Sequence, residues 1–254
     1  MLTLDPLRNL LLAGLPPEEM ALLNGSLEPV TFTQNEPLYR ANQPLSHAFF
    51  IVRSMVSMVR TTGEGATVEV GPVGRDGMIG VPIFLDATTD PLDAFAQILP
   101  CEALRMPAEA FRRASEQLPA LHSAMSRYTS WIYTGMAQWV ACARLHELDE
   151  RLGRWLLMCH DRLEGDTLAL THEFLAQMLG VRRPTVTLAA GMLQKAGLIR
   201  YSRGVVTILD RAGLEEVACE CHRVSRNEYL RLFGRLPTGE PAPAAEALPS
   251  SRWC

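Results

Sequence analysis

The sequence lacks several features that would place it in other protein classes. No window approaches the roughly 18 uninterrupted apolar residues of a membrane-spanning helix. The leucine-rich stretch 10–15 follows Asp5 and Arg8 rather than a cationic leader, so no secretory signal is expected. The six cysteines contain no CxxC pair and no repeated spacing, which disfavours a disulfide framework. We therefore expect a cytoplasmic protein of one or two domains with no membrane partner.

The motifs of common catalytic and metal sites are also missing. The chain has no GxSxG, no phosphate-binding glycine loop and no HExxH, so we expect neither an enzyme nor a bound cofactor. Cys219 and Cys221 form one CxC beside His222, whereas a closed metal site needs four well-spaced ligands. We interpret these cysteines as small residues on a helix and predict no metal site.

Acidic residues are absent from one long stretch of the C-terminal half. No Asp or Glu occurs from Phe174 through Leu209, and the cations in this stretch are Arg182, Arg183, Lys195, Arg200 and Arg203. The formal net charge of −4 conceals this contrast. Residues 1–149 carry 10 basic and 16 acidic side chains, net −6, whereas residues 150–235 carry 13 and 10, net +3. A cationic region in an acidic protein indicates a nucleic-acid partner.

The first hundred residues have the pattern of antiparallel β structure after a short helical segment. Residues 48–53 and 55–60 alternate like two paired strands, and residues 95–99 and 103–106 predict a further pair. Glycines recur every few residues from Gly63 to Gly80, as expected for short strands that turn repeatedly in a barrel or roll. We predict an α+β protein with a β-roll over residues 1–118.

A long helix is predicted over residues 119–145. Its apolar residues alternate at spacings of four and three, which is a heptad-like seam: Leu121, Met125, Tyr128, Ile132, Gly135, Trp139 and Cys142. Such a seam packs either on its own domain or on a second copy of the chain. No charged residue occurs between Arg127 and Arg144, so we favour a homodimer helix.

Residues 170–199 predict two helices joined by a tight turn. Thr171 is a favourable N-cap, Gly180 suits the left-handed residue that ends a helix, and Pro184 suits a first helical turn. The second helix then has a predicted buried stripe of Val186, Ala189, Ala190 and Leu193. The hairpin-like segment 198–209 follows, with a tip at residues 202–204.

The remaining face of this helix pair is typical of a major-groove reader. We expect Arg183 to contact base edges, because guanidinium binds guanine O6 and N7 in a bidentate way. The hydroxyl and cationic neighbours are expected to position the DNA backbone, and Leu188 offers an apolar contact. The predicted DNA-binding residues are Thr171, His172, Arg182, Arg183, Thr185, Thr187, Leu188, Lys195 and Arg203.

The order of β-roll, long helix and winged helix-turn-helix resembles the Crp/Fnr family of bacterial transcription regulators over residues 10–235. That family usually carries Gly-x-Ser-Arg-Glu-Thr-Val-x-Arg where this chain has Gly-Val-Arg-Arg-Pro-Thr-Val-Thr-Leu at 180–188. Arg183, Thr185 and Val186 are kept, whereas Arg182, Pro184 and Leu188 replace the Ser, the Glu and the second Arg. The resemblance implies the family's mode of docking on DNA, but not its usual base sequence.

Cations are missing where cyclic-nucleotide sensors of that family hold the phosphate. The family's Gly-Glu and Arg-Ser cassette corresponds here to residues 80–97, with Val81 in place of the Glu. No Lys or Arg occurs from Asp76 through Leu104, whereas the acids Asp86, Asp90 and Asp93 do. A buried phosphate without a cation is strongly disfavoured, so we do not expect cyclic-nucleotide binding. The three aspartates are interpreted as a solvated turn rather than a metal site.

The sensor residues that remain are apolar, which leaves either a packed interior or a pocket for an apolar small molecule. The predicted pocket residues are Met78, Phe84, Phe95, Trp131 and Trp139. His47 or His122 as a haem ligand stays open, although a lone histidine is more often structural. No cysteine precedes Cys101, which excludes the family's N-terminal iron–sulfur type.

The whole sequence predicts a homodimeric regulator that binds a near-palindromic site on double-stranded DNA, with RNA polymerase as a further partner. Its predicted parts are the β-roll 1–118, the dimer helix 119–145, the winged helix-turn-helix 146–235 and a disordered tail 236–254. The alternative is a module whose winged helix binds a protein partner.

Overall fold

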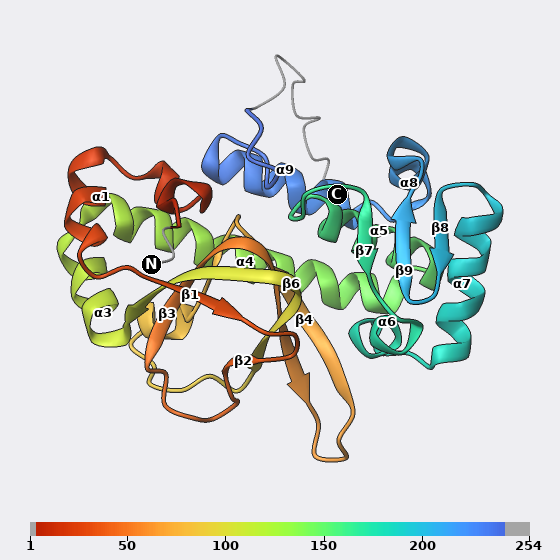
Figure 1. Cartoon of the computed structure of the whole chain (residues 1–254), viewed down its shortest axis with the longest axis horizontal. Coiled ribbons are helices and arrows are strands. Elements are labelled where there is room, and N and C mark those ends of the chain that lie inside the picture. Colours follow the sequence, from red (N-terminus) through yellow and green to blue (C-terminus); the bar gives the residue numbers. More distant parts are fainter. Residues whose placement is uncertain (1–3, 242–254) are drawn as a thin grey trace, which may run out of the picture.

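The computed structural model describes residues 4–241 and has the α+β architecture expected from the sequence. Figure 1 shows the β-roll below a long helix, α4, which crosses the molecule, and a second group of helices and strands at the far end of α4. Among the described residues, no helix is both long and apolar enough to cross a lipid bilayer.

The β-roll contains six antiparallel strands and small flanking helices. The sheet order is β1-β6-β3-β4, with β2 paired to β6 and β5 paired to β3. The strands are β1 (Glu28–Phe32), β2 (Pro37–Tyr39), β3 (His47–Thr61), β4 (Thr67–Val73), β5 (Met78–Ile79) and β6 (Asp93–Pro107). The helices are η1 (Pro6–Arg8), η2 (Leu12–Gly14), α1 (Pro17–Asn24), α2 (Val81–Phe84) and α3 (Ala108–Gln117).

Two predicted strand pairs are in fact single long strands, so this prediction was wrong. β3 continues through Ser54, whose φ of 76° and shifted pairing with β6 mark an irregularity rather than a hairpin turn. β6 likewise continues through Pro100. A bulge tolerates a polar or left-handed residue without ending a strand, and the sequence does not distinguish it from a short turn.

Helix α4 spans Pro119–Leu145, as predicted, but the predicted seam has a different role. Leu121, Met125 and Tyr128 are buried in the core of the roll, and Cys142 is also buried within the chain. The seam therefore packs mainly on the chain's own domain, which corrects its assignment to a dimer contact. The exposed large side chains of α4 lie elsewhere, at Tyr133 (77% exposed), Val140 (73%) and Leu145 (76%).

The C-terminal part combines a three-stranded sheet, ordered β7-β9-β8, with five helices. Helix α5 begins with a capping box between Glu147 and Glu150, which pairs two otherwise free N–H groups. The elements are α5 (Leu148–His160), β7 (Thr167–Ala169), α6 (His172–Leu179), α7 (Arg183–Lys195), β8 (Ile199–Ser202), β9 (Val205–Ile208), α8 (Arg211–Val217) and α9 (Cys221–Phe233).

The roll and the C-terminal part share one hydrophobic cluster. Met55, Val59 and Ile98 of the roll are buried in the same cluster as Trp155 and its neighbours in the C-terminal part. A buried ion pair also joins the two parts, because Arg162 contacts Asp76 at 2.6 Å with side chains 2% and 1% exposed. The Trp155 Nε1–H donates to Glu69 of β4, at 2.5 Å. The two parts are therefore packed against each other rather than joined by a free linker.

The start of the predicted disordered tail makes ordered contacts. Leu236 is buried and its N–H donates to the carbonyl of Glu240 at 2.9 Å. The Arg75 guanidinium donates to the carbonyl of Thr238. Residues 236–241 thus contact the roll, contrary to the prediction, because a turn and a cation from a distant segment hold them. Residues 242–254 of the predicted tail lie outside the described residues.

Candidate nucleic-acid interface

The helix pair α6–α7 has the local structure that its sequence predicts. The Thr171 hydroxyl accepts a hydrogen bond from the N–H of Phe174 at 3.1 Å, which caps α6. Gly180 ends this helix with φ of 65°, a left-handed conformation that favours glycine. Pro184 lies in the first turn of α7. The predicted stripe of α7 is buried as expected: Val186, Ala189, Ala190 and Leu193.

The opposite face of α7 is open to solvent. Arg182 and Arg183 are exposed at the N-terminal end of the helix, and Lys195 is exposed in its last turn. Leu188 is 70% exposed although it is large and apolar. Exposed on this surface are Thr171, Arg182, Arg183, Thr185, Thr187, Leu188, Lys195 and Arg203, which are eight of the nine predicted DNA-binding residues. Figure 1 shows α7 at the edge of the molecule, with the β8–β9 hairpin beside it.

The ninth residue, His172, is half-buried and joins three elements. Its ring stacks on Tyr201 of β8 with centroids 4.0 Å apart. Its Nδ1 lies 3.0 Å from the hydroxyl of Thr187 on α7, which also donates to the carbonyl of Arg183. Burial and the nearby Arg183 charge lower the pKa of His172. The contacts of His172 thus connect α6, α7 and β8.

The predicted hairpin is present as β8 and β9, with its tip at Arg203 and Gly204. Both tip residues have positive φ, 50° and 79°, as required in a tight two-residue turn that connects the strands of a hairpin. The carbonyl of Gly204 accepts from the N–H of Leu170 at 2.8 Å, which ties the tip to the start of the helix pair. The exposed guanidinium of Arg203 therefore lies on a fixed support.

Two residues of this surface were missed by the sequence reasoning. Met192 is 53% exposed and follows Leu188 by one helical turn, so the two form an apolar pair on the exposed face of α7. The spacing of four was visible in the sequence. Gln194 accepts from the N–H of Tyr201 at 2.7 Å and so connects α7 to β8, a contact that no local pattern indicates.

The five residues predicted to line an effector pocket do not surround one cavity. Met78 is fully buried in the roll core, and Trp131 stacks on Tyr128 at 5.8 Å. Phe84 packs edge-on against His122, whereas Phe95 packs against the cluster shared with the C-terminal part. Trp139 lines a small cavity of about 60 Å³ between β4 and α5.

A larger cavity of about 130 Å³ opens between the roll and the C-terminal part. Its lining includes Arg8, Arg53, Arg75 and Arg162, so it is cationic rather than apolar. Carboxylates and carbonyls already engage these guanidinium groups: Arg8 and Arg53 pair with Glu164, Arg162 with Asp76, and Arg75 with Thr238.

The three aspartates of residues 80–97 each make a separate contact. Asp90 is buried, contrary to the expected solvated turn, and accepts from the Tyr39 hydroxyl at 2.6 Å. Asp93 accepts from the N–H of Ala41 at 3.0 Å. Asp86 is exposed and pairs with Arg112 at 3.5 Å. Their oxygens are thus used in separate contacts.

The CxC motif lies in an arrangement that its sequence neighbours do not suggest. His222 turns away from Cys219 and Cys221 and pairs with Asp161, Nε2 to Oδ2, at 2.8 Å. Instead, Cys142 and His146 at the end of α4 lie beside the two cysteines.

Comparison with known proteins identifies both parts of the chain. A family profile described as "Crp-like helix-turn-helix domain" matches residues 150–217, and one described as "Cyclic nucleotide-binding domain" matches residues 29–117. Together the two profiles cover more than half of the chain.

The relatives are distant but extend over most of the chain. The "Global nitrogen regulator" of Nostoc sp. is 24% identical over 200 residues, 74% of this chain and 88% of the relative. The "CRP-like cAMP-activated global transcriptional regulator" of Mycobacterium tuberculosis is 24% identical over 204 residues, covering 78% and 91%.

Solved structures share the fold. A transcriptional regulator of the Crp/Fnr family from Eubacterium rectale superposes with a TM-score of 0.64 at 19% identity, covering 84% of this chain and 97% of the other. FixK2 from Bradyrhizobium japonicum superposes with a TM-score of 0.66 at 15% identity, covering 76% and 98%. With a cyclic-nucleotide-binding-type roll, a Crp-type helix-turn-helix and relatives along its length, the chain belongs to the Crp/Fnr family of non-enzymatic, DNA-binding transcription regulators.

Proposed function

We propose that this regulator reads a specific DNA sequence with the exposed face of α7. The observation that carries the proposal is the exposed face of α7, within the acid-free stretch 174–209, on which Arg182 and Arg183 precede the apolar pair Leu188 and Met192. Guanidinium groups at the start of a recognition helix suit guanine edges and phosphates, and an apolar pair one turn later suits thymine methyl groups. Arg203 on the hairpin tip is suited to a phosphate contact.

We also propose that the regulator acts as a homodimer through α4. Helix α4 has three large, exposed apolar side chains, Tyr133, Val140 and Leu145. Tyr133 and Val140 belong to a second seam, which is distinct from the buried one. Seam positions at alternating spacings of four and three are Ser126, Ser130, Tyr133, Ala137, Val140 and Arg144. A two-fold axis along this face would present two α7 helices to a near-palindromic site, about one helical turn of DNA apart.

The regulator is proposed to act without a cyclic nucleotide. The segment from Asp76 to Leu104 supplies no cation for a phosphate. Met78, Ile83 and Phe50 fill the interior of the roll and are fully buried. The Mycobacterium tuberculosis relative is named as cAMP-activated, and this chain departs from that chemistry in the phosphate cassette. An apolar effector and RNA polymerase as a partner stay predictions.

Binding to duplex DNA tests the proposal directly. The preferred site is selected from a pool of random duplexes, and its affinity is then measured over a range of salt concentrations. We expect a near-palindromic consensus and a linear fall of log K with log salt, because cations on the protein replace counterions on the phosphates. No measurable binding at low salt would contradict the proposal and favour a winged helix that binds a protein partner.

A further inference from the structure

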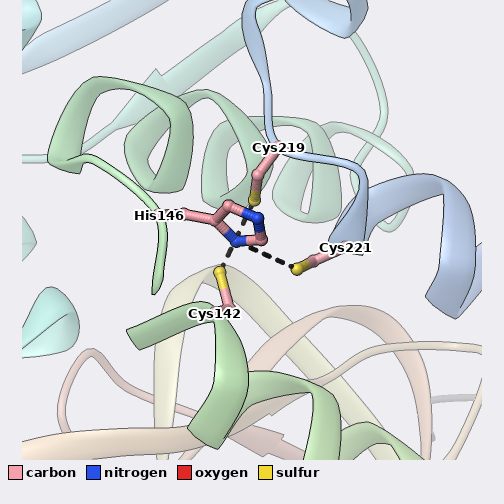
Figure 2. A group of neighbouring side chains, drawn as sticks. All are labelled: Cys142, His146, Cys219 and Cys221. Carbon is pink, nitrogen blue, oxygen red and sulfur yellow. Dashed lines mark hydrogen bonds between the residues drawn. The ribbon is translucent and has the colours of Figure 1, made fainter. Parts of the chain in front are cut away.

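Three thiols and one imidazole converge where α4 ends. Cys142 and His146 are four residues apart, so the last turn of α4 places them on the same side. Cys219 lies in the connection between α8 and α9, 77 residues after Cys142, and Cys221 is the first residue of α9. Figure 2 shows all four side chains pointing toward one another. Their ligand atoms all lie within 4.8 Å of one another.

Two of the distances between these atoms are close to those around a single tetrahedral ion. Zn–S bonds of about 2.3 Å and Zn–N bonds of about 2.0 Å at tetrahedral angles place neighbouring ligand atoms roughly 3.5–3.8 Å apart. The Cys142 and Cys219 sulfurs are 3.5 Å apart, and the Cys221 sulfur lies 3.4 Å from Nδ1 of His146. The ligands of a multi-iron cluster bond to different irons and are therefore spread more widely.

We propose that Cys142, His146, Cys219 and Cys221 form a structural Cys₃His zinc site. All three cysteines are buried, and they form a small cluster separate from both hydrophobic cores. Four protein ligands leave no open position for substrate, which is the arrangement of a structural rather than a catalytic zinc site. Three thiolate ligands favour Zn²⁺ over ions that prefer oxygen ligands, such as Mg²⁺ or Ca²⁺.

The surroundings suit a negatively charged metal–thiolate centre. The amide of Gln138 donates to the Cys221 sulfur at 3.1 Å, as outer groups do toward metal-bound thiolates. A zinc ion with three thiolates and a neutral histidine carries a net charge of −1, and the buried Arg154 guanidinium supplies a nearby positive charge. The Nε of Arg154 has no hydrogen-bond partner among residues 4–241.

The location gives the site a mechanical role. Its ligands join the end of α4, just before α5, to the start of α9, which packs back along α4. A zinc ion there fixes where α8 and α9 lie relative to α4. This role in positioning the DNA-binding part rests on the proposed function, whereas the zinc site itself does not.

Metal content of the full-length protein tests the site. We expect about one zinc per chain by elemental analysis of protein purified without added chelator. Cys142→Ser and Cys219→Ser should lose it, whereas Cys101→Ser and Cys159→Ser, which change equally buried cysteines outside the cluster, should retain it. Loss of zinc from the control variants as well would contradict the assignment.

A second measurement needs no variant and so does not depend on how a variant folds. Wild-type protein stripped of metal is titrated with Co²⁺, and the expected result is one equivalent bound with the visible spectrum of tetrahedral cobalt–thiolate coordination. A protein that contains no zinc and takes up no Co²⁺ would overturn the proposal. So would iron with inorganic sulfide in the purified protein, or a Cys142–Cys219 disulfide in protein kept from air.

The positioning role has its own readout. Zinc removal should weaken binding to the selected duplex by about tenfold, within the usual range for coupling between two sites. Restored affinity on adding Zn²⁺ back would support the role. Unchanged affinity after complete removal would contradict it, and zinc retention by a protein that binds no DNA would refute the proposed function while leaving the site intact.

Discussion

Arg183 is the residue on which base readout is expected to depend. Arg183→Ala should cost about 1–3 kcal/mol at the selected site and relax the preference at one position of each half-site. The reason is the loss of a bidentate guanine contact. Competition binding on duplexes substituted at each position measures this. The matched control is Arg203→Ala, which should weaken all sequences alike and reduce the salt slope by about one; the same uniform loss for Arg183→Ala would contradict its role.

Removal of only one partner of the Arg162–Asp76 pair is expected to destabilise the protein. Arg162→Met leaves the Asp76 carboxylate buried without its cation, which should lower the free energy of unfolding by about 3–5 kcal/mol. Chemical denaturation of the variant and of the wild type measures the difference. The double variant Arg162→Met/Asp76→Asn should recover most of the loss, because no unpaired charge remains. A single variant as stable as wild type would show that the pair is not buried in solution.

Asp161 links stability to pH. Burial alone would raise its pKa, but hydrogen bonds from His222 and Arg211 outweigh burial and lower the pKa of Asp161 to about 2. Because the folded pKa lies below the unfolded value of 3.8, this stability is present above pH 4 and is lost as pH falls toward 2. Asp161→Asn should therefore destabilise the protein by about 2 kcal/mol at pH 7 and much less near pH 2. An equal loss at both pH values would contradict this linkage.

At the scale of elements, two glycines near the recognition helix should respond oppositely to the same change. Gly180 ends α6 at φ of 65°, and an added Cβ would lie 3.1 Å from Val68 of the roll, so Gly180→Ala should cost about 1 kcal/mol or more. Gly191 lies within α7 with open space around it, so Gly191→Ala should stabilise by up to about 1 kcal/mol. Thermal unfolding compares the two; a shift of the same sign would show that helix geometry does not set the response.

The elements that the sequence predicted well are those set by neighbouring residues. The α6–α7 pair depends on a cap, a left-handed glycine and a stripe, all encoded within 25 residues. The heptad seam of α4 was visible but not its partner, because periodicity reports that a face is buried and not what covers it. The proposed zinc ligands could not be predicted either, because the sequence does not show that α9 packs against α4.

At the scale of the whole molecule, the assembly should depend on the exposed face of α4. Val140→Glu places a charge on the proposed two-fold contact and should shift the protein from dimer to monomer, because a desolvated like-charge pair opposes association. Sedimentation velocity measures the change. The same substitution at Val224 on α9 is the control and should leave the dimer intact. An unchanged dimer in Val140→Glu would place the interface elsewhere.

The hydrophobic cluster shared by the roll and the C-terminal part makes the chain one cooperative unit. Trp155 and its neighbours are covered by Met55, Val59 and Ile98 of the roll, so neither part buries all of its apolar surface alone. Heat should therefore unfold the monomer in a single calorimetric transition rather than in two. Any change that loosens the roll must then act on the same packed surface that supports α7, so a small rearrangement in one part shifts the packing of the other.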